Sequence, residues 1–114
     1  MKARNSPNMR NIITICFDGK RQAVASPVYQ WNYGMILRFA DLDLPSSYEV
    51  HFSYGDGPTT DVTVTDSNEV MIPNELLRQS GRLRAYIYIR TERSGRTMYE
   101  AVIPIIPRPE PERR

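Results

Sequence analysis

Apolar and polar residues alternate along most of this chain with a period of two, the pattern of strands that turn one face toward a core. The clearest alternation covers residues 48–54, where Tyr, Val and Phe at the even positions alternate with Glu, His and Ser. A second runs over residues 82–90, with Leu, Ala and Ile between Arg and Tyr. With a turn at residues 93–95 and a strand over 98–106, it predicts a long hairpin.

The first part of the chain carries another hairpin signal. Residues 11–17 are rich in β-branched side chains and end at Asp18-Gly19, a dipeptide that favours tight two-residue turns. We therefore expect residues 20–25 to return as the partner strand. Residues 73–78 begin with Pro and are followed by Gly81, which predicts one helical turn. Shorter strand-like runs lie at residues 29–33, 35–39, 62–64 and 70–72.

Together these elements predict an all-β fold. Seven to eight short strands with frequent turns indicate an antiparallel β-sandwich, immunoglobulin-like or jelly-roll, with one short helical turn. The 114 residues are enough for one domain with a two-layer core. We expect a flexible N-terminal arm over residues 1–10, the sandwich over residues 11–106 and a Pro-rich C-terminal tail over residues 107–114.

Composition narrows the function classes. The chain is 40% hydrophobic and 25% charged, as in an ordinary globular protein, and its net charge of +2 is too small to argue for nucleic acid. No stretch has the length of a membrane helix, and residues 1–10 lack the apolar core of a signal peptide, which predicts synthesis in the cytoplasm. The single cysteine, Cys16, cannot form an intrachain disulfide and is expected to be a small buried side chain.

Side chains suited to catalysis or metal binding are sparse. His51 is the only histidine; a triad with Ser53 and Asp61 is conceivable, but no nucleophile-elbow pattern supports it. Calcium ligands are conceivable at Asp41 with Asp43, and at Asp56 with Asp61, yet no calcium-loop pattern is present. We therefore predict that the protein is not an enzyme and has no catalytic residues, no cofactor and no metal.

The most informative surface is a row of Arg and Tyr on one face of the strand over residues 82–90. Because alternate side chains of a strand point the same way, these residues share one face: Arg82, Arg84, Tyr86, Tyr88 and Arg90. Arg and Tyr are enriched at protein interfaces and also in platforms for single-stranded nucleic acid. A plain solvated sheet face, with Met98 and Glu100 as cross-strand partners, is the third alternative. We favour the protein interface; the low net charge argues against nucleic acid.

A second aromatic group alternates at Tyr29, Trp31 and Tyr33. The simplest interpretation is core packing, because a Trp buried between two sheets is common in sandwiches. Carbohydrate stacking is the alternative.

Several short segments resemble, in the same order, those of a group of phage and prophage proteins of Gram-positive bacteria. The similarity spans residues 24–109, most of the chain. Its patches are SPVYQWNYG at 26–34, LDLP at 42–45, YEVHFS at 48–53, IPNELL at 72–77, AYIY at 85–88 and VIPII at 102–106, followed by Arg108-Pro109.

The resemblance implies a β-sandwich virion component of the kind that opens baseplate or tail-fibre proteins, ahead of a Pro-rich linker. This chain ends just after its Pro-rich segment, so we expect a free-standing module in the virion rather than a host adhesin. It would dock on other virion structural proteins of the tail, baseplate, neck or capsid surface, as a homo-oligomer or repeated on a symmetric particle. The alternative from the residues is a β-barrel module that binds single-stranded nucleic acid or another polyanion. No membrane partner is expected.

Overall fold

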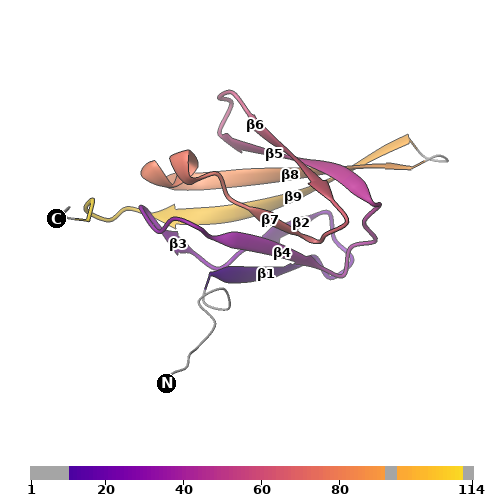
Figure 1. Ribbon diagram of the computed structural model, residues 1–114, viewed down its shortest axis with the longest axis horizontal. Helices are drawn as coiled ribbons and strands as arrows, with labels where there is room; N and C mark the ends of the chain where they lie inside the picture. The colour runs from indigo at the N-terminus through magenta and orange to yellow at the C-terminus, as the bar shows by residue number, and fades with distance from the viewer. Residues whose placement is uncertain (1–10, 92–94, 112–114) are drawn as a thin grey trace, which may run out of the picture.

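A computed structural model of the protein describes residues 11–91 and 95–111, without the side chains of residues 90–97, and Figure 1 shows its arrangement. The predicted arm over residues 1–10, residues 93 and 94 of the turn predicted at residues 93–95, and the end of the tail at residues 112–114 lie outside the described residues. The elements are β1 (Ile12–Cys16), β2 (Gln22–Val24), β3 (Val28–Tyr29), β4 (Ile36–Ala40), β5 (Ser47–Tyr54), β6 (Thr60–Thr65), β7 (Glu69–Met71), the 3-10 helix η1 (Asn74–Arg78), β8 (Gly81–Thr91) and β9 (Gly95–Ile106).

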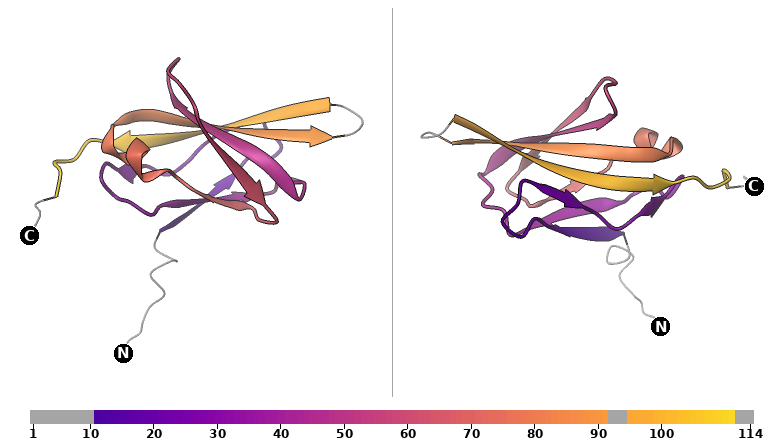
Figure 2. Two further views of the ribbon diagram at one scale, coloured as in Figure 1. Left: turned by 45° about the horizontal axis from the view of Figure 1, so that its top comes forward. Right: turned by 180° about the vertical axis from the view of Figure 1, so that it is seen from behind.

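The strands form two sheets, and the all-β prediction is confirmed. The smaller sheet has the order β1-β4-β7, and the larger sheet has the order β2-β9-β8-β5-β6, with β3 also paired to β9. Figures 1 and 2 show the smaller sheet lying against one side of the larger. Both sheets are mixed rather than purely antiparallel, because β1 runs parallel to β4 and both β2 and β3 run parallel to β9. The described residues hold nine strands instead of the seven to eight expected. β2 lies within the strand expected at residues 20–25, but it pairs with β9 and not with β1.

The two long strands form the predicted hairpin. β8 and β9 pair antiparallel from Gly81 opposite Ile105 to Thr91 opposite Gly95. β5 then pairs with the other edge of β8. These three strands make the centre of the larger sheet, and they position the candidate site described below.

The Asp18-Gly19 signal predicted a turn correctly and a hairpin wrongly. Both residues have positive φ, at 56° and 78°, and the Lys20 N–H donates to the Phe17 carbonyl over 2.9 Å. In a hairpin, the Phe17 N–H would return a bond to Lys20; here it donates to the Asp41 carboxylate over 3.0 Å. The Asp41 side chain also accepts the Asp18 N–H. The chain therefore leaves β1 at the turn and enters the other sheet at β2.

The core lies between the two sheets. β5 contributes Val50 and Phe52, β8 contributes residues 83–89 at its odd positions, and β4 contributes Leu37 and Phe39; all of these side chains are buried. The helical turn predicted at residues 73–78 is confirmed as η1, whose Leu76 and Leu77 close one end of the core.

Two tyrosines place their rings in or beside the core and their hydroxyls on backbone carbonyls. The Tyr48 hydroxyl donates to the Ser67 carbonyl over 2.8 Å, and the Tyr54 hydroxyl donates to the Leu76 carbonyl over 2.7 Å. Burial disfavours the charged phenolate and raises the pKa of each side chain to about 12. These hydroxyls tie the two ends of β5 to the loop before β7 and to η1.

Two expectations about burial are wrong. Cys16 is exposed, because Ile15 fills the inward position of β1 and the next residue faces out. Tyr29 and Tyr33 are also exposed, and Trp31 is only half-buried. The alternation fails there because β3 ends at Tyr29 and Trp31 has a φ of 73°, which turns the chain out of the sheet.

Candidate functional site on the outer face of the larger sheet

The Arg/Tyr row of β8 lies on the face of the larger sheet that points away from the core. Leu83, Ala85 and Ile87 are fully buried on the inner face, so the residues between them must point outward. Arg82 is exposed, and Arg84, Tyr86 and Tyr88 are partly exposed. The side chain of Arg90 lies outside the described part of the chain. We call this surface the outer face; the smaller sheet packs on the opposite side (Figure 2).

Neighbouring strands surround the row with partners that the alternation predicts. Tyr86 lies opposite Glu100 of β9 and His51 of β5, and Tyr88 lies opposite Met98 and Glu49. The expected cross-strand partners Met98 and Glu100 are therefore confirmed.

Glu100 is an almost fully buried carboxylate on this otherwise open face. Glu100 is only 7% exposed. One carboxylate oxygen accepts a hydrogen bond from the Arg84 guanidinium, and the other accepts one from the Gln22 side chain, each over 2.7 Å. The hydrogen bond and the charge of Glu100 raise the pKa of Arg84. Arg84 is thus fixed in place, with its charge balanced.

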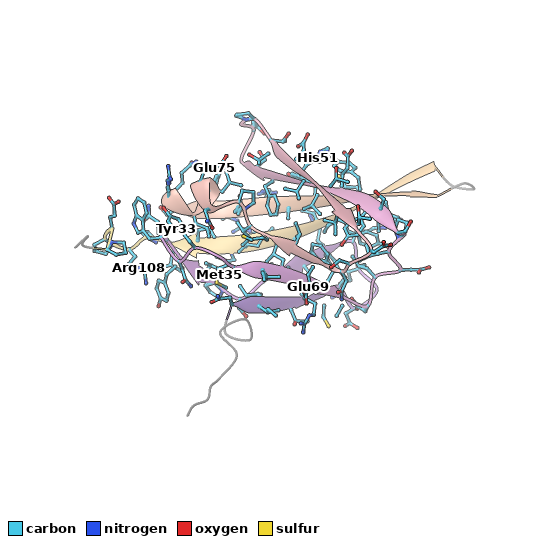
Figure 3. The ribbon with its side chains drawn as sticks, viewed as in Figure 1. Tyr33, Met35, His51, Glu69, Glu75 and Arg108 are labelled. Atoms are coloured by element: carbon cyan, nitrogen blue, oxygen red, sulfur yellow. The ribbon has the colours of Figure 1, made fainter. Side chains whose placement is uncertain are left out.

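His51 sits in a second cluster, visible in Figure 3 near the upper edge of the larger sheet. Its Nε2 lies 2.8 Å from Oε1 of Glu49, and its Nδ1 lies 3.7 Å from Oδ1 of Asp61. The ring of Tyr88 packs against it with centroids 4.6 Å apart. The buried Ser53 hydroxyl donates instead to the turn carbonyls of Gly55 and Gly57. Ser53, His51 and Asp61 therefore do not form a triad; His51 is a hydrogen-bonded surface residue.

Sequence reasoning missed an apolar stripe that crosses the same face. On β9, Val102, Pro104 and Ile106 face outward; Val24 of β2 lies opposite Val102, and Tyr29 of β3 lies opposite Ile106. Val24 is 69% exposed, Tyr29 is 54% exposed and Ile106 is 36% exposed, whereas Val102 between them is only 7% exposed. We call these five residues the apolar stripe.

The Arg/Tyr row borders this stripe directly. Arg82 lies opposite Pro104, and Arg84 lies opposite Val102. The available sequence signal was the run over residues 101–106, which is apolar at odd and even positions alike. A strand that is apolar on both faces calls for cover on both faces.

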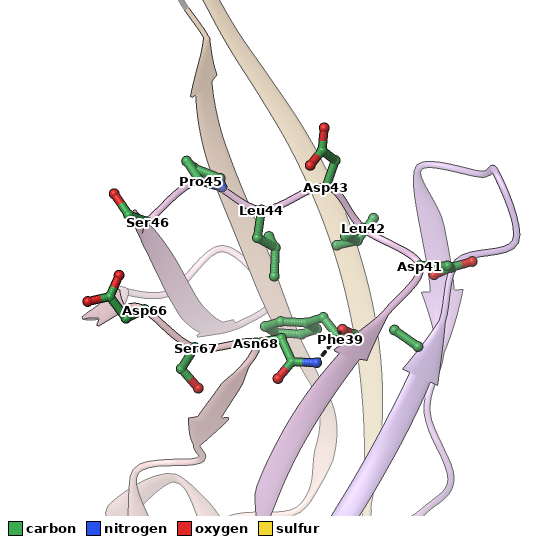
Figure 4. A pocket seen from close by; sticks show the side chains of 11 residues that line it. Phe39, Asp41, Leu42, Asp43, Leu44, Pro45, Ser46, Asp66, Ser67 and Asn68 are labelled. Carbon is green, nitrogen blue, oxygen red and sulfur yellow. Dashed lines mark hydrogen bonds between the residues drawn. The ribbon is translucent and has the colours of Figure 1, made fainter.

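Two hollows lie at the edges of the sheets. One of about 510 Å³ adjoins the outer face and is lined by Lys20, Arg21, Gln22, Met98 and Glu100. The other, of about 470 Å³, lies under the loop after β4, with Phe39 and Leu44 among its lining residues (Figure 4).

The second hollow is lined by Asp41 and Asp43, one of the two aspartate pairs considered as calcium ligands. In Figure 4 the side chains of Asp41, Asp43 and Asp66 point away from one another, and the Asp41 carboxylate is already bound to two backbone N–H groups. In the other pair, Asp61 faces His51, and Asp56 is exposed in the turn after β5. Residues 11–91 and 95–111 hold no cluster of three or more side chains suited to a metal ion.

The described residues thus define an all-β protein of two packed sheets, with an exposed outer face that carries an apolar stripe bordered by Arg side chains. No known family model matches the chain, and a search of curated proteins finds no significant match. The resemblance to phage structural modules stays a prediction. In the described part of the chain, no helix has the length and apolar character to span a membrane.

Proposed function

We propose that this protein is a phage virion structural module that docks on other virion structural proteins through the outer face of its larger sheet. The observation that carries the proposal is the apolar stripe bordered by the Arg/Tyr row. The resemblance of residues 24–109 to phage modules supplies the kind of assembly, whose tail, baseplate, neck or capsid surface would provide the partner.

The composition of the outer face supports a protein partner. Exposed contiguous apolar surface bordered by polar residues is typical of interaction sites. Tyr, Arg and Met are enriched at interfaces, and Tyr and Arg supply most hot spots. Here Tyr86, Tyr88 and Met98 stand on the same face as the stripe, and Met98 is 41% exposed.

The face is also ordered before any partner arrives. The Arg84–Glu100–Gln22 hydrogen bonds fix three side chains, and the ring contact with His51 supports Tyr88. Side chains that are already held lose less conformational entropy on binding. A weak contact of this kind would be strengthened by repetition on a symmetric particle.

The charges indicate what the partner surface would look like. Arg84 is balanced by Glu100, whereas no ion pair involves Arg82 among the described residues. We expect the partner to place apolar side chains over the stripe and a carboxylate near Arg82. Glu49 and Asp61 stand on the same face, and their charges would repel a phosphate backbone.

The first test is localisation on purified particles of the phage that encodes the chain. Mass spectrometry should find the protein in the particles, and gold-labelled antibody should mark one structure in the electron microscope. Label on the capsid would support a decoration protein, and label at the tail tip a baseplate module. Absence from the particles would overturn the proposal.

The second test separates docking from folding. Val24→Asp should abolish incorporation into particles, because it places a charge in the stripe; Met71→Asp, at a residue 52% exposed on the smaller sheet, is the matched control. The double variant Tyr86→Ala/Tyr88→Ala should weaken incorporation and keep the fold. Equal incorporation of both Asp variants would contradict the assignment. Oligonucleotide binding that falls steeply with salt would favour the polyanion alternative instead.

A further inference from the structure

The Pro-rich segment after β9 does not leave the molecule freely. Its first residues pass a corner of the chain at the end of β3, formed by Tyr29, Gln30 and Trp31. The Gln30 N–H donates to the Ile106 carbonyl over 2.8 Å, so the corner lies beside the last residue of β9. Figure 3 shows Arg108 at this end of the molecule. We call Tyr29, Gln30 and Trp31 the aromatic corner.

The corner contacts Arg108 through three groups. The Trp31 indole N–H donates to the Arg108 carbonyl over 2.9 Å, and the Arg108 N–H donates to Oε1 of Gln30 over 3.1 Å. The guanidinium carbon of Arg108 lies 5.9 Å from the centroid of the Tyr29 ring, a cation–π distance. Both backbone groups and the side chain of one residue are therefore bound.

The corner is held in its shape by contacts that do not involve the tail. Trp31 has a φ of 73°, a conformation that bulky residues rarely adopt, and its backbone N–H donates to the Leu77 carbonyl over 2.7 Å. The Gln30 side chain donates to the Arg78 carbonyl over 2.6 Å. Arg78 in turn donates to the Tyr33 hydroxyl over 3.2 Å. Strained residues that surrounding structure holds in place are typical of binding sites.

The chemistry of the segment suits this site. Pro107 and Pro109 have no N–H, so Arg108 supplies the one backbone donor of the three residues. Chains rich in Pro adopt an extended helix without internal hydrogen bonds, which leaves their backbone groups to a partner. Grooves lined by aromatic rings are the general way in which proteins bind such segments.

We propose that the aromatic corner is a binding site for Pro-Arg-Pro segments, that the chain's own residues 107–109 occupy it, and that it accepts such a segment as a separate peptide. Tyr29 selects Arg at the central position by stacking, and Gln30 and Trp31 read the backbone.

The experiment uses the single tryptophan of the chain. Trp31 gives one indole N–H resonance in a ¹H–¹⁵N spectrum, and this proton is the one that contacts Arg108. In the full chain we expect slow exchange of this proton with solvent. The variants Gln30→Ala and P107G/R108G/P109G should move the resonance toward that of free indole and speed its exchange about tenfold or more. Pro111→Ala is the matched control in the same tail and should change neither.

The peptide IIPRPEP is then added to the P107G/R108G/P109G variant, whose substitutions lie in exposed residues. The indole resonance should return toward its position in the full chain in a saturable way. The peptide IIPGPEP should bind at least tenfold more weakly. An indole resonance unchanged by the triple substitution would overturn the docked tail. A resonance that moves in the variant but does not respond to millimolar peptide would overturn the binding site for separate segments.

Discussion

The two faces of the larger sheet are built from the same strands and held by different forces. On β8, Leu83, Ala85 and Ile87 point inward and are fully buried against the smaller sheet. The residues between them point outward, where Arg84 is held by an ion pair and Tyr88 by a ring contact. The smaller sheet shields the inner face from water. The side chains of the outer face are held by contacts with one another, without a covering layer.

This difference separates stability from recognition. Each fully buried aliphatic or aromatic side chain contributes about 1.5–3 kcal/mol by leaving water, so the inner face determines whether the protein folds. Contacts between partly exposed side chains, such as that of Tyr88 with His51, contribute less to folding but fix the positions of the groups that a partner meets. The outer face can therefore change its partner without changing the fold.

The largest expected effect comes from the inner face. Phe52 is fully buried at the centre of β5, so Phe52→Ala should lower the free energy of unfolding by about 3–5 kcal/mol. Urea denaturation followed by circular dichroism measures the change. Phe52→Leu should cost less, which keeps the comparison usable if the Ala variant does not fold. A loss below 1 kcal/mol for Phe52→Ala would contradict the assignment of Phe52 to the core.

The next effect tests the buried carboxylate of the outer face. Glu100→Ala removes both hydrogen-bonded oxygens from Arg84 and Gln22, and should cost about 1–3 kcal/mol of unfolding free energy. The matched control is Glu69→Ala, which breaks the more exposed pair with Arg38 and should cost less than about 1 kcal/mol. If the two variants lose equal stability, the burial of Glu100 has no energetic consequence.

Alkaline pH should lower the free energy of unfolding through two tyrosines of β5, Tyr48 and Tyr54. Burial raises the pKa of Tyr48 and of Tyr54 from 10.0 to about 12, so the folded state keeps its protons where the unfolded state has released them. The contribution to stability is complete below pH 10 and is lost as the pH rises from 10 to 12. Urea midpoints across this range measure the loss. Tyr48→Phe cannot ionise and should flatten the decline; an identical decline in that variant would argue against the shift at Tyr48.

The smallest effect on stability belongs to Arg82. Arg82→Glu changes an exposed side chain and should alter the free energy of unfolding by no more than about 0.5 kcal/mol. Incorporation into particles should nevertheless fall, because the partner would now meet a like charge. Arg38→Glu on the smaller sheet should leave incorporation unchanged. The reverse ranking would place docking on the smaller sheet.

The long alternations made most of the fold predictable. The strand at residues 48–54, the β8–β9 hairpin and the helical turn at residues 73–78 all follow from local pattern and turn chemistry. What failed was pairing: Asp18-Gly19 makes its turn, but the carboxylate of Asp41 takes the N–H that a hairpin would use. A contact between residues so distant in sequence cannot be read from a local dipeptide.

Only part of the candidate site could be predicted, because the rest depends on contacts between residues that are distant in sequence. The alternation places Arg82, Arg84, Tyr86 and Tyr88 on one face with Glu100 as neighbour. The apolar stripe depends on β2 and β3 lying beside β9, and two strands of two or three residues carry no detectable period. The aromatic corner depends on the positive φ of Trp31, which the residue types around this position do not predict.

Because of the position of β9 within the larger sheet, we expect the mechanical resistance of the molecule to depend on the direction of pulling. β9 pairs with β8 on one side and with β2 and β3 on the other, and Arg108 follows it at the aromatic corner. Hydrogen bonds between strands run across the strand direction. A pull on the tail therefore meets the corner first, and then loads the bonds along both edges of β9 together, in shear, instead of opening them one at a time. If the tail connects this protein to a larger assembly, we expect single-molecule pulling to show high resistance along this axis, and much lower resistance when force is applied across the edge strand β6.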